Sequence, residues 1–177
     1  MGIFRDVLGH NESLFLNPQA LDFDYQPKVL LYREAEQRSM AAAIKPLFAG
    51  RSGRNLFISG PPGIGKTIAC THVIKELEEE TDEVLALYIN CWQKNTTFKI
   101  LVELCELLHY PFTQNKNTEQ LIKIIEEKLN KTAAVLVFDE ADKLDDINFL
   151  YTLLEKLLRK SIFLITNEGD WLALLDN

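Results

Sequence analysis

Hydrophobic positions along the chain follow two different repeats, which predict two kinds of element. Short, mostly apolar runs predict strands at residues 56–59, 84–90, 134–139 and 162–166. Apolar residues that recur every three or four positions predict helices at residues 33–48, 67–80, 97–109, 118–129 and 149–158. Alternation of strands and helices in this way predicts a parallel sheet with helices on its faces.

Three local signals refine the ends of these elements. Pro46 falls late in the first helical pattern and is expected to kink that helix or end it early. Asn117, followed by Gln120 three positions later, has the spacing of a capping box and predicts the start of the fourth helix. The apolar stripe of the last helix is expected to face the core through Phe149, Leu150, Leu153, Leu154, Leu157 and Leu158.

The loop between the first strand and the second helix carries the most specific motif of the chain. Residues Gly60–Thr67 fit the pattern G-x-x-x-x-G-K-[ST]. Glycines let backbone N–H groups cradle a polyphosphate, and the following helix adds its positive dipole end. Lys66 supplies a cation for the β- and γ-phosphates, and Thr67 offers a hydroxyl to Mg²⁺. The loop residues predicted to bind ATP or ADP are Pro62, Gly63, Ile64, Gly65, Lys66, Thr67 and Ile68.

A second motif follows the strand that is apolar at every position from Ala134 to Phe138. Such a strand is buried on both faces, and its carboxyl end is where open α/β sheets bind ligands. Asp139, directly after the apolar run, is suited to hold Mg²⁺, because Mg²⁺ favours few carboxylates plus water and phosphate oxygens. Glu140 is placed to orient and deprotonate an attacking water, which indicates hydrolysis as well as binding.

The last predicted strand also ends in a polar residue, Asn167. In a parallel sheet, this end lies beside the Asp139 strand and close to the γ-phosphate. The Asn167 amide is placed to hydrogen-bond a phosphate oxygen and the attacking water, which makes it a catalytic candidate together with Lys66 and Glu140. Asparagine is also an ordinary residue at the end of a strand, so both interpretations stay open.

Composition adds limits on partners and environment. The chain has 177 residues, 47% of them hydrophobic, which is enough for one substantial core. Its net charge of −7 indicates that, if nucleic acid is a partner, most of the basic binding surface lies elsewhere. Three widely spaced cysteines predict no disulfide framework or metal site and suit a reducing, cytoplasmic environment. No apolar run approaches membrane-spanning length, so no membrane partner is expected.

The three motifs together resemble the nucleotide site of AAA+ ATPases. Gly60–Thr67 looks like the Walker A motif, Asp139–Glu140 like Walker B, and Thr166–Asn167 like sensor 1. The resemblance implies the three-layer α/β fold of a P-loop NTPase, a parallel sheet covered by helices. It further implies that the first strand lies between the fourth strand and a fifth.

Segments outside the nucleotide motifs narrow the resemblance. Phe23–Pro27 followed by Tyr32–Glu34, and Ile89–Cys91 after the second strand, are similar to archaeal replication initiators. These are relatives of the eukaryotic origin-recognition subunit and cell-division-control loader. The resemblance implies ATP-dependent recognition of origin duplex DNA. It also implies that the replicative helicase or other AAA+ subunits are partners, near the nucleoid of an archaeal-type cell.

The same resemblance sets expectations for domain organisation. Family members continue into a helical lid, an arginine that acts in trans and a winged-helix DNA-binding domain. This sequence ends at Asn177, so we expect an AAA+ core at residues 33–177, with the lid and C-terminal DNA-binding domain absent. Residues 1–32 are expected to form an N-terminal extension and adenine-side flap. Because arginine fingers strongly accelerate phosphoryl transfer, hydrolysis by this chain is expected to be slow.

The flap supplies candidate residues for binding the base. A phosphate loop leaves the adenine to other, mostly apolar walls. Two proline bends and an apolar run favour a stiff flap over the loop, and Arg33 is suited to stack on or bond to the base. The candidates are Tyr25, Pro27, Val29, Leu30 and Arg33. The alternative is that the apolar residues only pack the N-terminus onto the core and Arg33 begins a solvated helix.

Other functions fit parts of the same pattern. Asp139–Asp142 spells the signature of DEAD-type RNA helicases, but the sequence shows neither their second motor domain nor a Ser-Ala-Thr element. A different AAA+ loader or signalling ATPase is a closer alternative. A nucleotide-dependent interaction switch with negligible turnover is another. Trp92 either stacks on a nucleic-acid base or, as we expect, covers the top of the core.

Overall fold

The computed structural model describes residues 33–171, which lie in the unit Tyr32–Asn177. Helices and strands alternate along these residues, as the hydrophobic pattern predicted. In chain order they are α2 (Glu34–Ile44), the 3₁₀ helix η2 (Lys45–Ala49), β1 (Leu56–Ser59), α3 (Lys66–Glu80), β2 (Val84–Asn90), α4 (Thr97–Leu107), α5 (Thr118–Leu129), β3 (Ala133–Asp139), η3 (Ala141–Lys143), α6 (Asn148–Lys156) and β4 (Lys160–Thr166).

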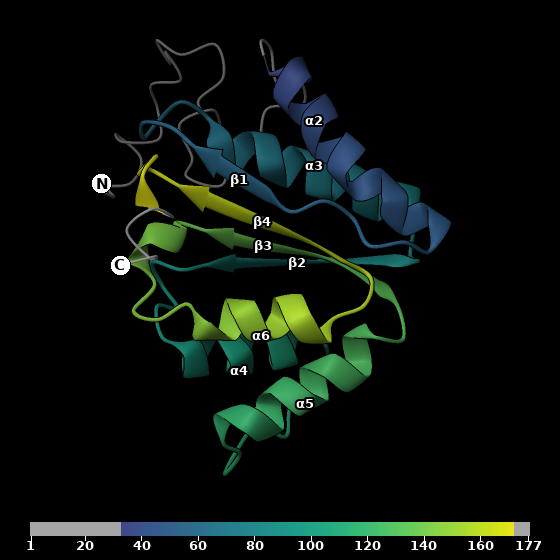
Figure 1. The fold of residues 1–177 in the computed structure, drawn as a ribbon, viewed down its shortest axis with the longest axis vertical. Helices are drawn as coiled ribbons and strands as arrows, with labels where there is room; N and C mark the ends of the chain where they lie inside the picture. Colours follow the sequence, from purple (N-terminus) through teal and green to yellow (C-terminus); the bar gives the residue numbers. More distant parts are fainter. Residues whose placement is uncertain (1–32, 172–177) are drawn as a thin grey trace, which may run out of the picture. The chain divides into compact units, whose positions relative to one another are not determined.

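The four strands form one parallel sheet in the order β1-β4-β3-β2 (Figure 1). β3 lies inside the sheet, and all of its residues are buried, which confirms that a fully apolar strand is covered on both faces. β1 pairs with β4, as the AAA+ strand order implies, and among the described residues it forms an edge of the sheet. All four carboxyl ends therefore lie at one edge of the sheet, where the predicted site residues follow.

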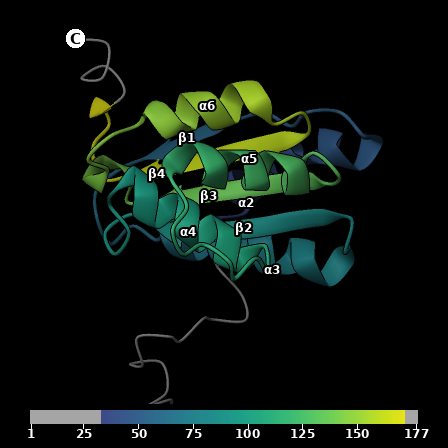
Figure 2. The same ribbon diagram turned by 90° about the horizontal axis from the view of Figure 1, so that it is seen from below.

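Helices cover both faces of the sheet and give the expected three layers. α2 and α3 lie over one face, and α4, α5 and α6 lie over the other (Figures 1 and 2). Leu136 and Phe138 of β3 belong to the hydrophobic core beneath α4, α5 and α6. Because side chains alternate along a strand, Val137 and Asp139 face α3 instead. The candidate site residue Asp139 therefore lies on the α3 side of the sheet.

Two predicted helix boundaries are confirmed by the backbone. α2 ends at Ile44, and the chain continues as a 3₁₀ helix with Pro46 in its first turn, as the position of this proline indicated. At α5, the Asn117 side chain accepts from the backbone of Gln120, and the Gln120 side chain accepts from the backbone of Asn117. This is the predicted capping box, and it fixes the start of α5.

The prediction for the last helix is wrong at two positions. Leu158 is 67% exposed because α6 ends at Lys156 and Leu157 adopts an extended conformation, which turns the next side chain outward. Leu154 is 36% exposed and borders an apolar groove beside β1. The other four residues of the stripe are buried: Phe149, Leu150, Leu153 and Leu157.

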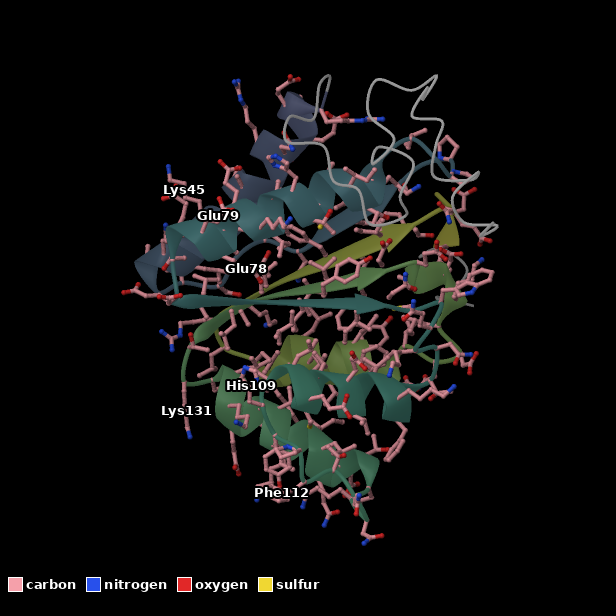
Figure 3. All side chains as sticks on the ribbon, turned by 180° about the vertical axis from the view of Figure 1, so that it is seen from behind. Lys45, Glu78, Glu79, His109, Phe112 and Lys131 are labelled. Carbon is pink, nitrogen blue, oxygen red and sulfur yellow. The ribbon has the colours of Figure 1, made fainter. Side chains whose placement is uncertain are left out.

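The outer face of α3 is acidic near its C-terminal end, where Glu78 and Glu79 are exposed (Figure 3). A helix rises about 1.5 Å per residue, so this 15-residue helix places its acidic end roughly 20 Å from its start at Lys66. The negative charge is therefore far from the end of α3 that faces the phosphate loop.

Candidate functional site

The loop from Gly60 to Gly65 joins β1 to the start of α3 and has the backbone conformation of a phosphate cradle. Gly60, Gly63 and Gly65 have φ values of 154°, 79° and 90°, a region that side chains other than glycine rarely adopt. A Cβ added at Gly60 would also lie 2.7 Å from Ile64 Cδ1. The glycines of the motif are thus required by the path of the loop, and the loop leads into the positive dipole end of a 15-residue helix.

Lys66, the first residue of α3, connects this loop to the end of β4. Its Nζ donates to the carbonyl oxygens of Gly60 and Pro61 at 2.8 and 3.0 Å. It also donates to Asn167 Oδ1 at 2.9 Å. All three partners are neutral oxygens, so within residues 33–171 no carboxylate neutralises the ammonium charge. A phosphate oxygen would be a stronger partner for this cation.

Asp139, at the end of β3, is almost fully buried and holds three hydrogen bonds. Its Oδ2 accepts from Thr67 Oγ1 at 2.7 Å and from the Tyr88 hydroxyl at 2.6 Å, and its Oδ1 accepts from the backbone N–H of Glu140 at 2.9 Å. Burial and the bond to Asp139 raise the pKa of Tyr88 above its ordinary value, so its hydroxyl stays protonated and donates. A hydroxyl beside one fixed carboxylate fits Mg²⁺, which takes few protein ligands in addition to phosphate and water oxygens.

Glu140 has a left-handed backbone conformation, with φ 53° and ψ 45°. A non-glycine residue pays roughly 1–2 kcal/mol for this conformation, and such strain concentrates at functional sites. At this residue the backbone turns away from the direction of β3. Glu140 thereby lines the cavity that Lys66 and Thr67 also line. The predicted water-activating carboxylate therefore lines the same cavity as the predicted phosphate and metal residues.

A cavity of about 220 Å³ gathers these groups at the carboxyl edge of the sheet. It is lined by Pro62, Gly63, Gly65, Lys66, Thr67, Ile68, Asp139, Glu140, Ile165, Thr166 and Asn167. All predicted phosphate, metal and catalytic residues line it except Ile64. A lysine, a hydroxyl, two carboxylates and an amide thus surround one space, which is the arrangement needed to bind and cleave a polyphosphate.

The predicted adenine side is described at one position only. Arg33 precedes α2, and its guanidinium donates to the carbonyl oxygen of Ile64 and pairs with Glu36 at 2.7 Å. It therefore touches the phosphate loop from the outside, next to the cavity. The other candidates, Tyr25, Pro27, Val29 and Leu30, lie outside the described residues.

Comparison with known proteins assigns the family. A family model described as an AAA domain matches residues 50–168, about two thirds of the chain, and the match includes Gly60–Thr67, Asp139–Glu140 and Asn167. The chain belongs to this AAA domain family. The family match and the parallel, helix-covered sheet agree with the sequence-based fold class.

Relatives of this chain include archaeal replication proteins. The chain is 34% identical over 175 residues to ORC1-type DNA replication protein 1 of Sulfurisphaera tokodaii, and the match covers 92% of this chain and 44% of the relative. It is 34% identical to ORC1-type DNA replication protein 2 of Methanothermobacter thermautotrophicus, covering 83% and 38%. The ORC1 protein of Aeropyrum pernix, solved in complex with DNA, is 25% identical with a TM-score of 0.74, covering 87% and 44%. The chain thus spans less than half the length of these proteins.

Sequence reasoning missed two residues of the AAA domain site. Tyr88 reaches Asp139 from the neighbouring strand, and the one signal for it is its hydroxyl among the apolar side chains of residues 84–89. Asp142 accepts hydrogen bonds from Thr166 and Asn167, although the sequence suggested only its place in a helicase-like signature. The expectation that Trp92 covers the core is wrong, since its side chain is 66% exposed. It lies in the turn at residues 91–93, directly after β2, and that turn leaves the ring exposed to solvent.

The three cysteines of the AAA domain are free and buried. Burial, reinforced by the charge of Asp139, raises the pKa of Cys70 and of Cys91 to about 12, and burial also raises the pKa of Cys105. At pH 8 a thiol with such a pKa is roughly one part in ten thousand thiolate, so the folded protein is expected to react very slowly with a disulfide reagent. Urea-unfolded protein should titrate all three thiols at once. Rapid stoichiometric labelling of folded protein would contradict this.

The same shifts predict a pH dependence of stability. Unfolded cysteines ionise near pH 8.5, whereas folded Cys70 and Cys91 ionise near 12. The stabilising contribution is therefore complete below about pH 8.5 and is lost as the pH rises toward 12. Denaturant unfolding at pH 7.5 and 9.5 measures this loss.

Proposed function

We propose that this AAA domain binds ATP with Mg²⁺ and hydrolyses it, as the nucleotide-binding module of a DNA replication initiator. The observation that carries the proposal is the convergence of Lys66, Thr67, Asp139, Glu140 and Asn167 on one cavity. These residues come from two strand ends and the start of a helix, far apart in the sequence. A cavity lined by a lysine, carboxylates and an amide at the carboxyl edge of the sheet favours phosphoryl transfer over a structural role.

The phosphates bind to the loop between β1 and α3. Its backbone N–H groups and the start of α3 attract the anionic oxygens, and Lys66 exchanges its neutral carbonyl partners for phosphate. Thr67 and Asp139 would hold Mg²⁺, with Asp139 oriented by Tyr88 and by the backbone of Glu140. An ion held there would supply positive charge that favours attack on the bound phosphates.

Glu140 accepts the proton of the attacking water, and Asn167 positions that water against the γ-phosphate. Asn167 Oδ1 accepts from Lys66 Nζ at 2.9 Å, so this amide lies within reach of the proposed phosphate-binding cation. An amide donor near the transferred group stabilises charge that develops in the transition state.

On the adenine side, Arg33 stabilises the phosphate loop through the carbonyl of Ile64 and supports the base from there. Arg33→Ala is expected to weaken ATP and ADP binding equally, by about tenfold, the cost of one charge-assisted hydrogen bond. The equal effect follows because Arg33 contacts Ile64 and not the γ-phosphate side of the cavity. Calorimetry measures both affinities, with the exposed Arg38→Ala on α2 as the matched control. An effect on ATP alone would refute the adenine-side assignment.

The replication role follows from the relatives. Two ORC1-type DNA replication proteins are 34% identical to this chain, and a 25% identical ORC1 protein was solved in complex with DNA. We propose that this chain supplies the ATP-dependent step of origin duplex recognition and helicase loading, in contact with other AAA+ subunits. With a net charge of −7, its own surface is unfavourable for a long duplex, so further basic surface makes most DNA contacts. Within residues 33–171, none of the helices has the length and apolar character to cross a membrane.

A nucleotide-dependent interaction switch with negligible turnover is the second candidate, because the same cavity can bind a nucleotide without cleaving it. Two measurements on the purified chain distinguish the functions. Calorimetry with MgATP tests binding, and phosphate release measured beside nucleotide-dependent self-association separates an enzyme from a switch. No affinity for ATP would refute the nucleotide-binding proposal, and binding with self-association but no phosphate release would favour the switch.

A further inference from the structure

Asp142 is a fully buried carboxylate just beyond the nucleotide cavity. Its Oδ1 accepts from Thr166 Oγ1 at 2.9 Å and from the backbone N–H of Asn167 at 3.3 Å, while its Oδ2 pairs with Lys143 Nζ at 2.6 Å. Burial raises the pKa of Asp142, but the bonds from Lys143, Thr166 and Asn167 outweigh it and hold the pKa below its ordinary value. The carboxylate is therefore ionised at neutral pH and ties the end of β4 to the 3₁₀ helix η3.

Oδ1 of Asp142 accepts from two residues that line the nucleotide cavity. Asn167 is bound to Asp142 through its backbone and to Lys66 through its side chain, so Asp142 fixes the position of the amide that faces the phosphates. Thr166, also held by Asp142, lines the same cavity. A displacement of the β4 end by about 1 Å is enough to cost on the order of a hundredfold in a positioned reaction.

The other oxygen, Oδ2, leads to the surface through Lys143. Lys143 Nζ lies 5.7 Å from the centre of the Trp92 ring, within the range of a cation–π contact. Trp92 stands on the turn after β2 and is exposed, so Lys143 bridges a buried charge and a solvent-facing aromatic ring. The described contacts thus form an unbroken path from Lys66 through Asn167, Asp142 and Lys143 to Trp92.

We propose that Asp142 is a positioning residue that holds Asn167 in the nucleotide site and, through Lys143, makes the surroundings of Trp92 depend on nucleotide binding. The inference rests on the proposed function. When a phosphate takes Lys66, the bond from Lys66 to Asn167 Oδ1 must be shared or released. Asn167 then changes position relative to Asp142, which accepts from its backbone N–H. Lys143, which pairs with Asp142 Oδ2, shifts with that carboxylate. A ligand shifts a structure only through such differential contacts.

The test uses Trp92 emission in the Trp171→Phe background, which leaves one tryptophan because the chain has two. Phenylalanine keeps the aromatic stack of residue 171 on Phe57. We expect MgATP to change Trp92 emission in this protein and not in the same protein with Lys143→Met. Nucleotide affinity from calorimetry should change little in that variant, since Lys143 does not line the cavity. The matched control is Lys94→Met. Lys94 is two residues from Trp92 and forms a 2.7 Å ion pair with Glu103, outside the proposed path, so this variant should keep the emission change.

Turnover tests the positioning role itself. Asp142→Ala should lower kcat by roughly ten- to a hundredfold with little change in KM, because it disturbs Asn167 and leaves Lys66 in place. Asp142→Asn keeps an acceptor oxygen and the size of the side chain, and should retain more kcat than alanine. It also gives a result if the alanine variant does not fold, since loss of the ion pair alone should abolish the Trp92 response.

Each outcome separates the inference from the function beneath it. ATP binding without any change in Trp92 emission would overturn the inference and leave the proposed function intact. So would an undiminished response in Lys143→Met, or an unchanged kcat in both Asp142 variants. Failure of the unsubstituted chain to bind ATP would instead overturn the proposed function and this inference with it.

Discussion

Lys66→Ala is expected to lower ATP affinity by on the order of a hundredfold, the value of one or two charge-assisted hydrogen bonds. Lys66 is the proposed phosphate-binding cation of the cavity, and it donates to the neutral oxygens of Gly60, Pro61 and Asn167. Alanine removes the charge and also frees the loop from the end of β4. Calorimetric titration with MgATP and MgADP measures the loss, which should be large for both nucleotides.

Lys75→Ala provides the matched control. Lys75 lies on the same helix and is exposed, so its removal changes the net charge equally without reaching the cavity. Thermal unfolding of both variants without nucleotide establishes that the fold is retained. If Lys66→Ala bound ATP as tightly as Lys75→Ala, the loop would not be the phosphate site.

The strands, most helix boundaries and the composition of the site could be predicted because each depends on residues close together in sequence. α2 ends just before Pro46, as expected because proline lacks a backbone N–H. Asn117 caps α5 through a hydrogen bond with Gln120, three residues later. The apolar run ending at Asp139 indicated burial on both faces, and the parallel order then brought Asp139 near Asn167. Local chemistry and one topological rule were sufficient for these positions.

Contacts between strands and side-chain exposure were not accessible in the same way. The bond from Tyr88 to Asp139 depends on the register of β2 against β3, which places Tyr88 opposite Val137 on the α3 face. The left-handed backbone of Glu140 follows from tertiary constraints, since glutamate has no intrinsic preference for it. Exposure of Leu158 depends on where α6 ends, and helix ends are weakly encoded.

Glu140→Gln is expected to lower the rate of ATP hydrolysis by about 10²–10⁴-fold, the usual contribution of a general base. Glutamine has the size of glutamate and keeps its hydrogen-bonding reach, but it cannot accept the proton of the attacking water. ATP affinity should stay near that of the unsubstituted chain, because the proposed phosphate and Mg²⁺ contacts come from Lys66, Thr67 and Asp139 and not from Glu140. Single-turnover phosphate release, with calorimetry on the same samples, separates the two effects.

Glu168→Gln serves as the control, because it removes the same charge one residue beyond Asn167 at an exposed position outside the cavity. Both substitutions reduce the negative charge near the site, so a general electrostatic effect on MgATP would appear in both. A selective loss of hydrolysis in Glu140→Gln therefore reports the proton acceptor itself. If this variant instead loses ATP binding as completely as Lys66→Ala, the strained turn at Glu140 has a structural role, and the general base must be sought elsewhere in the cavity.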